Sequence, residues 1–369
     1  MTNRAPRIAL GLMSGTSLDG IDGAIVRTDG ERILDLGPAL TVPYDAPFRD
    51  RLRAVLGADA KEEAIAPVAR ELTLRHAEAA RAVIDANAAS PAGLGPVAVI
   101  GFHGHTVLHR PERRLTRQIG DGALLARATG VAVVGDFRGR DVAEGGEGAP
   151  LAPLYHAALA ASLEKPLAVL NVGGVANLTF LNGDVMAFDT GPGNALIDDW
   201  TRAATGQPFD AGGGLAGSGR PDDAIVAEMM EHSYFTRPPP KSLDRADIGL
   251  AAVSDLSPAD GAATLTAFTA AAVARAVDFL PAPPRRWLVS GGGRHNRTLM
   301  GALSDVLAVP VEAVEAVGWQ GDALEAQAFA FLAVRSIYGL PLSLPSTTGV
   351  ARPMTGGKLH GVPGAASPR

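Results

Sequence analysis

Short apolar runs rich in β-branched residues alternate along the chain with longer alanine-rich stretches of helical periodicity. Strands that alternate with helices in this way predict an α/β fold. Glycine and proline separate most of the predicted elements, and the Gly/Pro/Ser-rich tail 353–369 is expected to pack poorly. The expected strands are 7–12, 97–102, 131–134, 167–172, 177–181, 185–188 and 287–290. The expected helices are 48–56, 61–88, 122–128, 151–163, 195–203, 221–232, 262–280, 297–302 and 323–338.

One supersecondary pattern occurs twice. An apolar strand, the turn GLMSGTSLDGID and a second strand near Ile21 span residues 8–26, and LAVLNVGGVANLTFL repeats this order at 167–181. At 369 residues the chain is long enough for two domains. The repeat therefore predicts duplicated domains that face each other across a cleft, at 1–165 and 166–350, followed by a tail at 351–369.

Three glycine turns follow predicted strands, and each is a candidate for binding phosphate. A turn at residues 15–17 gathers main-chain N–H groups, and an anion can approach glycine closely because glycine has no Cβ. The other two turns contain Gly173 and Gly174, and the SGGG of residues 290–293. None has the G-x-G-x-x-G spacing of a single dinucleotide-binding fingerprint, so we expect each turn to contact a different part of one nucleotide.

Charge and composition exclude several classes of protein. The net charge is -6, the isoelectric point is near 5.8 and no long Lys/Arg cluster is present, so no nucleic acid partner is expected. The chain has no cysteine, which excludes disulfides and thiolate metal sites. Arg275 and Asp278 interrupt the apolar stretch 264–280, which favours a buried helix over a membrane span. With no signal peptide recognised at the start, a cytoplasmic location without a membrane partner is expected.

An ordered set of motifs resembles one known family. In chain order these motifs are GLMSGTSLDGID, FHGHT, DFRGRDVAEGGEGAPL, NVGGVANLT, FDTGPGNALID, PPPKS, SGGGRHN and GDALEAQAFA. Together they are similar to the anhydro-N-acetylmuramic acid kinases, over residues 11–349. That family belongs to the actin, sugar kinase and heat-shock ATPase superfamily, so the resemblance implies two related actin-like (ribonuclease H-like) domains around a nucleotide.

The resemblance implies ATP and Mg²⁺, an amino sugar as the small-molecule partner, and a role in cell-wall recycling. It leaves a homodimer open. The implied nucleotide contacts are Gly15, Thr16, Ser17, Leu18, Asp19, Gly20, Ile21, Asp22, Gly173 and Gly174, with Gly291, Gly292 and Gly293 by the adenosine, and Asp19 is also the candidate metal ligand. The implied sugar contacts are His103, His105, Asp136, Arg138 and Asn177. His105 and Glu147 stand where the family usually has glutamine.

The family reaction opens a 1,6-anhydro ring while a phosphoryl group is placed on the 6-oxygen. Because the bridging oxygen is an ether without a proton, the base must act on water. Asp189 is the expected base, since it follows a predicted strand and matches the family's catalytic aspartate; otherwise it would organise the Gly-Pro turn. Asp322 and Glu325 have the spacing of a capping box, so Glu325 either caps the last helix or supports Asp189. Arg138, Lys241 and Arg245 remain open as cations for the sugar's lactyl carboxylate.

Two other classes of function stay in view. His103 and His105 form an H-x-H after a strand, and alternate strand residues share a face, so a metal-dependent hydrolase would use this pair. No further histidine is spaced to complete such a metal centre. A non-catalytic ATP-dependent clamp of the same superfamily is the third class, but such chaperones carry a long peptide-binding extension.

Overall fold

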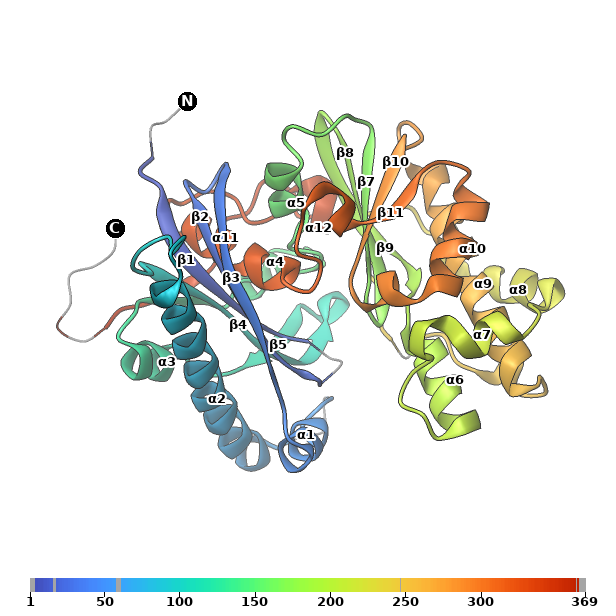
Figure 1. Cartoon of the computed structure of the whole chain (residues 1–369), viewed down its shortest axis with the longest axis horizontal. Coiled ribbons are helices and arrows are strands. Elements are labelled where there is room, and N and C mark those ends of the chain that lie inside the picture. Colours follow the sequence, from blue (N-terminus) through green and yellow to red (C-terminus); the bar gives the residue numbers. More distant parts are fainter. Residues whose placement is uncertain (1–3, 16–17, 58–60, 246, 363, 365–369) are drawn as a thin grey trace. The chain divides into compact units, whose positions relative to one another are not determined.

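The chain forms two compact units. The computed structural model describes residues 4–15, 18–57, 61–245, 247–362 and 364. The first unit is Met1–Ala161 together with Ala323–Arg369, and the second is Ser162–Asp322. Each unit contains one sheet with helices packed on it (Figure 1). The α/β fold predicted from the alternating pattern is therefore confirmed.

The first unit is built on a seven-stranded sheet of order β12-β6-β4-β1-β2-β3, with β5 paired to β4. β1, β2 and β3 form an antiparallel meander, while β4 runs parallel to β1 and β6 parallel to β4. Its strands are β1 (Arg7–Ser14), β2 (Gly20–Thr28), β3 (Ile33–Pro43), β4 (Val99–Arg110), β5 (Leu115–Ile119), β6 (Val133–Gly135) and β12 (Lys358–His360). Its α-helices are α1 (Ala46–Arg53), α2 (Glu62–Ala89), α3 (Gly122–Thr129), α4 (Gly139–Ala143), α5 (Pro153–Leu159), α11 (Leu324–Ile337) and α12 (Pro345–Thr348).

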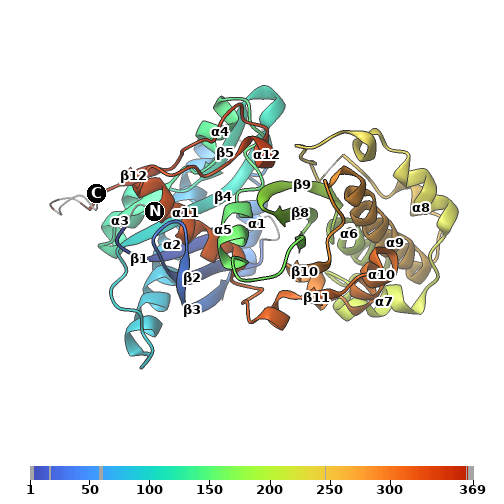
Figure 2. The ribbon, with the colours of Figure 1, turned by 90° about the horizontal axis from the view of Figure 1, so that it is seen from above.

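Helices α2 and α11 cover opposite faces of this sheet (Figures 1 and 2). Leu10 and Leu12 of β1 are buried in a core that includes residues of α2. Gly11 lies between them and faces α11, where a Cβ would come within 1.7 Å of the Ala326 carbonyl oxygen. Gly101 of β4 meets the carbonyl of Phe329 in the same way. The glycines thus let the α11 backbone rest directly on the sheet, which a side chain would prevent.

The second unit repeats this plan on a five-stranded sheet of order β11-β10-β7-β8-β9. β7, β8 and β9 form an antiparallel meander, while β10 runs parallel to β7 and β11 parallel to β10. Its strands are β7 (Leu167–Val172), β8 (Val175–Asn182), β9 (Asp184–Pro192), β10 (Arg286–Ser290) and β11 (Val311–Ala313). Its α-helices are α6 (Ala195–Thr205), α7 (Gly214–Ser218), α8 (Asp223–Met230), α9 (Pro258–Ala276) and α10 (Arg297–Leu307). Reading β3-β2-β1-β4-β6 against β9-β8-β7-β10-β11 gives the same order and the same strand directions, so the duplication expected from the sequence is present.

Single-turn 3₁₀ helices complete the described elements. They are η1 (Pro111–Arg113), η2 (Ala211–Gly213), η3 (Ser233–Thr236), η4 (Ala251–Val253), η5 (Val277–Phe279), η6 (Gly292–His295) and η7 (Val314–Val317).

The chain does not divide where the sequence placed its boundary. Residues 323–350 were expected in the second domain, but α11 packs on β1, β2 and β4 of the first unit. The described part of the tail packs better than expected: Met354 is buried, and β12 pairs with β6. The paired residues 358–360 contain neither glycine nor proline, so their N–H and C=O groups can complete a sheet edge.

One helix among the described residues is long and apolar enough to cross a membrane by length and composition, and it spans Pro258–Phe279. It includes α9, which packs against β9, α6, α7, α8 and α10. Leu265, Phe268 and Val273 are buried in the cores of the second unit. The helix is therefore a core element, as its sequence predicted.

Candidate active site

The first glycine turn joins β1 to β2. Thr16 and Ser17, two of its expected phosphate contacts, lie outside the described residues. Leu18 has a φ of 61° and donates its N–H to the Gly15 carbonyl at 3.1 Å. The side chains of Leu18 and Ile21 are buried in the core, so only their main chains are available to a ligand. Gly20 is explained by the sheet, since a Cβ would lie 2.5 Å from the Val42 carbonyl oxygen.

Tyr44 holds both ends of this turn, which sequence reasoning missed. Its N–H donates to the Asp19 carbonyl at 2.9 Å, and its hydroxyl lies 2.7 Å from the Ser14 hydroxyl. Ser14 in turn lies 3.0 Å from Nδ1 of His105. These contacts join residues 30 and 91 positions apart. No local signal could have predicted them.

His103 and His105 lie on opposite faces of the first sheet. Leu12 pairs with Phe102 but Ser14 pairs with His105, so β4 has one extra residue, and Gly104 within this bulge has a φ of 72°. A bulge reverses the alternation of side chains. The His103 ring therefore packs 4.5 Å from Phe329 of α11. His105 lies on the α2 side, where it interacts electrostatically with His76.

The alternative of a metal-dependent hydrolase that uses the H-x-H pair is therefore not supported. Among the described residues, no group of three or more His, Cys, Asp or Glu side chains could hold a metal ion. The expectation that His105 contacts the sugar does not fit either, because its side chain is fully buried and bonded to Ser14. The bulge explains both differences.

Arg138 is held in place by two hydrogen bonds. Its Nε donates to Nε2 of His103 at 3.1 Å, and NH1 donates to the Gly148 carbonyl at 2.7 Å. The N–H of Gly148 donates to the buried Asp141 carboxylate at 2.7 Å, which also accepts bonds from the hydroxyls of Ser343 and Thr348. The segment DFRGRDVAEGGEG is thus tied to the chain after α11.

Two further positions of that segment are placed at or near the surface. Asp136 is exposed, and its Oδ1 accepts from the N–H of Gly139 at 3.1 Å. Glu147 is half-buried, and its N–H donates to the Thr348 carbonyl at 2.7 Å.

Glu325 interacts electrostatically with Arg138, Asp22 and Asp19 in the first unit. Desolvation raises the pKa of Glu325; Arg138 lowers it, and Asp22 and Asp19 raise it. Asp19 is exposed, while Asp22 is half-buried and accepts from the Thr41 hydroxyl at 2.6 Å. The structure therefore brings together residues predicted separately as metal ligand, sugar contact and supporting carboxylate.

The capping-box alternative for Glu325 is wrong. α11 begins after Ala323, with no side-chain cap, and the Asp322 carboxylate instead pairs with Arg294 at 2.7 Å. Glu325 lies in the first turn of the helix, where the residue as a whole is exposed while surrounding protein desolvates its carboxyl group and raises its pKa.

The second glycine turn lies beside the start of α6. The N–H of Asn194 donates to the Gly173 carbonyl at 2.7 Å, and that of Gly193 donates to the Gly174 carbonyl at 2.9 Å. A Cβ on Gly173 or Gly174 would meet no protein atom closer than 3.5 Å. The turn is thus fixed by its carbonyls, and protein packing alone does not require its glycines. A helix N-terminus beside open main chain suits an anion.

The third glycine turn packs on the end of β7. Gly291 has a φ of 74°, and a Cβ there would lie 2.4 Å from Asn171 Oδ1. Gly293 is equally close to Val172, at 2.4 Å from its Cγ1. Gly292 is different, because a Cβ would meet only Asn194 Nδ2, at 3.7 Å.

Asp189 of β9 lies opposite Asn177 of β8 in the antiparallel register. Directly opposed residues share a face of the sheet, so the predicted base and a predicted sugar contact are neighbours. Asp189 is 8% exposed, and its Oδ2 accepts from the N–H of Leu243 at 3.0 Å.

Two cations considered for the lactyl carboxylate have other partners. The Lys241 ammonium is buried among aromatic rings, and Arg245 pairs with both oxygens of Asp199 at 2.7 and 2.8 Å. Arg138 also has partners, but it lies beside the predicted sugar contact His103 and interacts electrostatically with Glu325.

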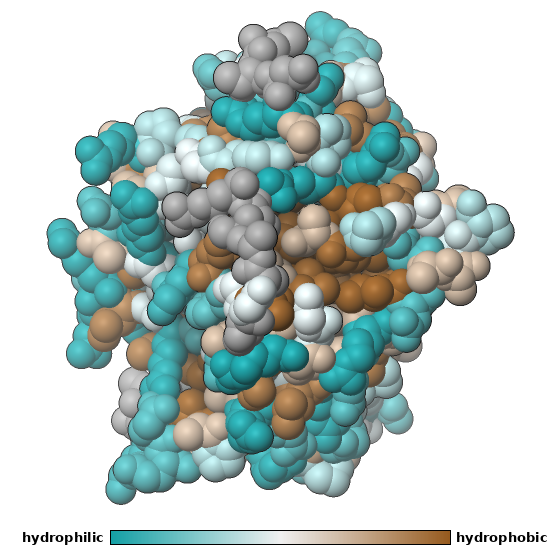
Figure 3. All heavy atoms as spheres, turned by 90° about the vertical axis from the view of Figure 1, so that its left-hand side faces the viewer, coloured by the Kyte–Doolittle hydropathy of each residue, from teal (hydrophilic) through white to brown (hydrophobic). Residues whose placement is uncertain are grey.

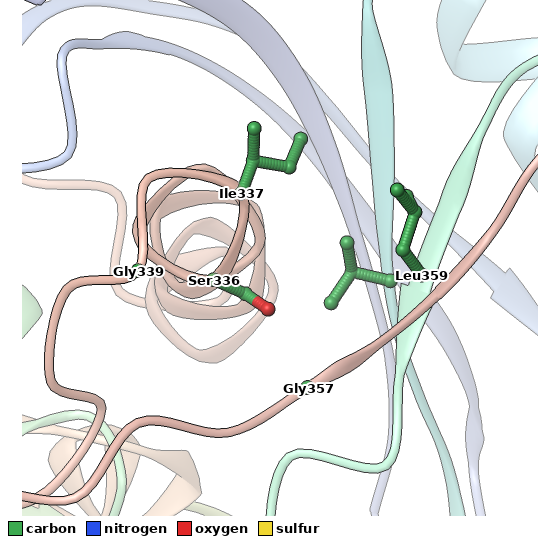
Figure 4. Close-up of a pocket in the computed structure, with 6 residues that line it drawn as sticks. Ser336, Ile337, Gly339, Gly357 and Leu359 are labelled. Carbon is green, nitrogen blue, oxygen red and sulfur yellow. The ribbon is translucent and has the colours of Figure 1, made fainter. Parts of the chain in front are cut away.

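One cavity of the first unit lacks catalytic chemistry. It has a volume of about 270 Å³ and lies in the first unit, where Figure 4 shows Ser336 and Ile337 of α11 beside Gly357 and Leu359. The hydroxyl of Ser336 already donates to the Gly356 carbonyl at 2.7 Å. On the face shown in Figure 3, hydrophobic residues gather near the centre within a hydrophilic surround. Neither feature brings together the side chains that a reaction requires.

The two units have the same strand order, and each has a glycine turn after its first strand, so the chain has a duplicated α/β fold. A model of the anhydro-N-acetylmuramic acid kinase family matches residues 7–361. The chain belongs to this family.

Curated relatives and a solved structure match nearly the whole chain. The anhydro-N-acetylmuramic acid kinase of Rhodospirillum rubrum is 60% identical over 354 residues, covering 95% of this chain and 93% of the relative. That of Paramagnetospirillum magneticum is 56% identical and covers 96% and 99%. The crystal structure of (R)-2-hydroxyglutaryl-CoA dehydratase component A from Acidaminococcus fermentans is 11% identical, with a TM-score of 0.46 and coverage of 90% and 99%.

Proposed function

We propose that this protein uses ATP to phosphorylate the 6-oxygen of 1,6-anhydro-N-acetylmuramic acid while water opens the anhydro ring. The products are N-acetylmuramic acid 6-phosphate and ADP. The observation that carries this proposal is membership of the family across residues 7–361. The proposed setting is recycling of cell-wall sugars in the cytoplasm.

Asp189 is the proposed general base. The bridging ether oxygen has no proton to give up, so Asp189 takes a proton from water as the water attacks the anomeric carbon. The bond from that carbon to the 6-oxygen breaks, and the 6-oxygen attacks the γ-phosphate of ATP in line. The bond between Leu243 N–H and Oδ2 supports this role, because it fixes the direction of the carboxylate.

The first unit supplies the proposed sugar and metal contacts. Arg138 suits the lactyl carboxylate, because His103 and Gly148 orient its guanidinium. Glu325 is the proposed supporting carboxyl group, and desolvation is the main cause of its raised pKa. Asp136 of this unit and Asn177 of the second unit remain proposed sugar contacts.

Mg²⁺ fits the carboxylates of this unit. The ion keeps several waters and takes few protein oxygens, so the exposed Asp19, with Asp22 nearby, would hold it without a larger cluster. When bound, Mg²⁺ would offset the negative charge of the phosphates. Main-chain groups of the glycine turns at 15–22, 173–174 and 291–293 are the proposed contacts to ATP.

One incubation tests the proposal. The purified protein is mixed with Mg-ATP and 1,6-anhydro-N-acetylmuramic acid, and products are identified by mass and by a reducing-sugar assay. We expect ADP and a 6-phosphorylated reducing sugar in equal amounts. ADP without the sugar product, or no turnover at all, would overturn the proposal. A reaction without ATP that depends on zinc would restore the hydrolase alternative.

A further inference from the structure

One short segment of the second unit holds Asp189 by three hydrogen bonds. The hydroxyl of Tyr234 donates to the Asp189 carbonyl. The N–H of Asp189 donates to the Lys241 carbonyl at 3.1 Å, and the N–H of Leu243 donates to Oδ2 at 3.0 Å. Residues 234–243 therefore set both the backbone position and the carboxylate direction of Asp189.

The side chain of Lys241 braces this segment from within. Lys241 is 3% exposed, and its Nζ donates to the Tyr234 carbonyl at 3.0 Å. The ammonium lies 4.5 Å from the ring centres of both Tyr234 and Phe279, and 5.9 Å from that of Phe188. The Lys241 ammonium thus links the two ends of the segment 234–243, which is hydrogen-bonded to Asp189.

A buried ammonium is a costly way to fill an apolar space. Replacing buried ions by apolar groups of similar volume is often neutral or stabilising. Three aromatic rings could pack equally well around an uncharged chain, so the charge of Lys241 calls for a role beyond stability. Its neighbour Asp189 supplies one, because the two groups attract each other electrostatically.

We propose that Lys241 is a positioning residue for the phosphoryl-transfer reaction, and that its ammonium holds residues 234–243 in the geometry that orients the Asp189 carboxylate. This proposal rests on the proposed function, in which Asp189 is the base.

The charge of Lys241 is adjustable near neutral pH. Burial lowers the pKa of Lys241 to about 8, Arg237 and Arg275 lower it as well, and Asp189 opposes them. The remaining titratable group at the ammonium is the Tyr234 phenol, whose hydroxyl is engaged with the Asp189 carbonyl. As pH rises through about 8, Lys241 loses its proton, and its contacts with Tyr234 and the aromatic rings lose their positive charge.

Two substitutions of Lys241 separate these effects. Lys241→Met keeps an unbranched chain in the cage and removes both the charge and the hydrogen bond, whereas Lys241→Gln removes the charge but retains a donor. The matched control is Phe279→Leu, which loosens the same cage without touching the ammonium bond. The measurements are kcat, the KM values for ATP and for the sugar, the unfolding temperature and the pH profile of kcat.

We expect Lys241→Met to lower kcat by about tenfold or more, because small misplacements of a reacting group are costly. Both KM values and the unfolding temperature should stay near those of the wild type. The wild type should lose activity above about pH 8, and Lys241→Met should lack that decline. Lys241→Gln should fall between the two, and Phe279→Leu should keep its kcat.

The outcomes are distinguishable. An inactive wild type would overturn the proposed function itself. An active wild type with normal kcat and an unchanged alkaline decline in Lys241→Met would overturn only the role of Lys241. Equal losses of kcat and unfolding temperature in both Lys241 variants and in Phe279→Leu would show a purely structural role and would overturn it as well.

Discussion

Arg138 donates its Nε–H to Nε2 of His103 at 3.1 Å, and this bond fixes the tautomer of the histidine. A guanidinium can only donate, so Nε2 of His103 must accept. The ring proton is therefore on Nδ1, where it is donated to the Gly104 carbonyl at 3.0 Å. Burial is the main cause that holds the pKa of His103 well below its usual range, and the charge of Arg138 adds to it. The histidine therefore stays neutral and acts as a fixed acceptor.

This relationship predicts that Arg138→Lys impairs sugar binding. A lysine has one flexible ammonium and cannot make the bonds to His103 and Gly148 in the fixed directions of a guanidinium. We expect the KM for the sugar to rise about tenfold, because this is the effect of losing one charge-assisted hydrogen bond. The KM for ATP should stay unchanged. The control is Arg140→Lys at an exposed position that contacts Thr355. Equal changes in both KM values would argue against a sugar role.

The buried histidines of the first unit predict acid sensitivity. Burial lowers the pKa values of His76, His105 and His156 to about 4, against 6.5 in the unfolded chain. Below pH 6.5 the unfolded state binds more protons, so their contribution to stability is complete above 6.5 and is lost as pH falls towards 4. Each group contributes about 3 kcal/mol at most.

The variant His105→Gln tests this dependence. Glutamine does not titrate, and its amide can still bond to Ser14. Urea unfolding at pH 7, 6 and 5 should show a shallower loss of stability in His105→Gln, by about 1 kcal/mol per pH unit. Parallel curves for variant and wild type would show that His105 does not titrate as its burial predicts.

How far the sequence predicts this fold depends on where each element makes its contacts. β7 and β10 are found within one residue because their apolar runs are continuous and buried. β3 is missed, since its residues are mostly half-buried and include two prolines. Contacts between distant segments are not visible at all, so α11 was assigned to the wrong unit. Tyr44 likewise acts through its contact with Ser14, 30 positions away in the chain. The segment around Lys241 acts through the bond between Leu243 and Asp189, which lie 54 positions apart.

Local motifs were enough to name candidate residues, but not to predict the backbone geometry around them. Asp189 was expected just after a strand at 185–188, and the structure places it inside β9, buried and opposite Asn177. The H-x-H argument failed because strand alternation assumes a regular β4, whereas the bulge at Gly104 turns His105 away from His103. Gly104 itself was the available signal, because an isolated glycine within a strand pattern often marks a bulge.

The third glycine turn predicts opposite effects at neighbouring positions. Gly291→Ala should lower the unfolding temperature by several degrees, because a Cβ would lie 2.4 Å from Asn171 Oδ1 and φ is 74°. Gly292→Val should keep the unfolding temperature near that of the wild type, since a Cβ at Gly292 would meet only Asn194 Nδ2, at 3.7 Å. It should nevertheless weaken ATP binding if this turn contacts the nucleotide. Calorimetric titration with ATP, alongside thermal unfolding, checks both; unchanged ATP affinity in folded Gly292→Val would remove this turn from the nucleotide site.

Replacing Asp189 by asparagine gives the most direct test of the base. Asn keeps the size and an oxygen that can accept from Leu243 N–H, but it cannot take a proton from water. General-base catalysis contributes about 10²–10⁴-fold, so turnover should fall by that amount while ATP still binds. Steady-state rates and an ATP titration measure the two effects. Near-normal turnover would move the base elsewhere, with Glu325 the next candidate.

The fate of solvent oxygen tests the same step independently of mutation. If Asp189 activates water at the anomeric carbon, product formed in ¹⁸O-water must carry the label on the anomeric hydroxyl, while the 6-oxygen keeps its original atom. The reaction is quenched early, before the free sugar exchanges its anomeric oxygen by ring opening, and fragment masses locate the label. Because the 6-oxygen attacks phosphorus, water oxygen has no route into the phosphate of the sugar product. Label found in inorganic phosphate instead would mean that ATP is hydrolysed without ring opening, and Asp189 would then serve a different reaction from the one proposed.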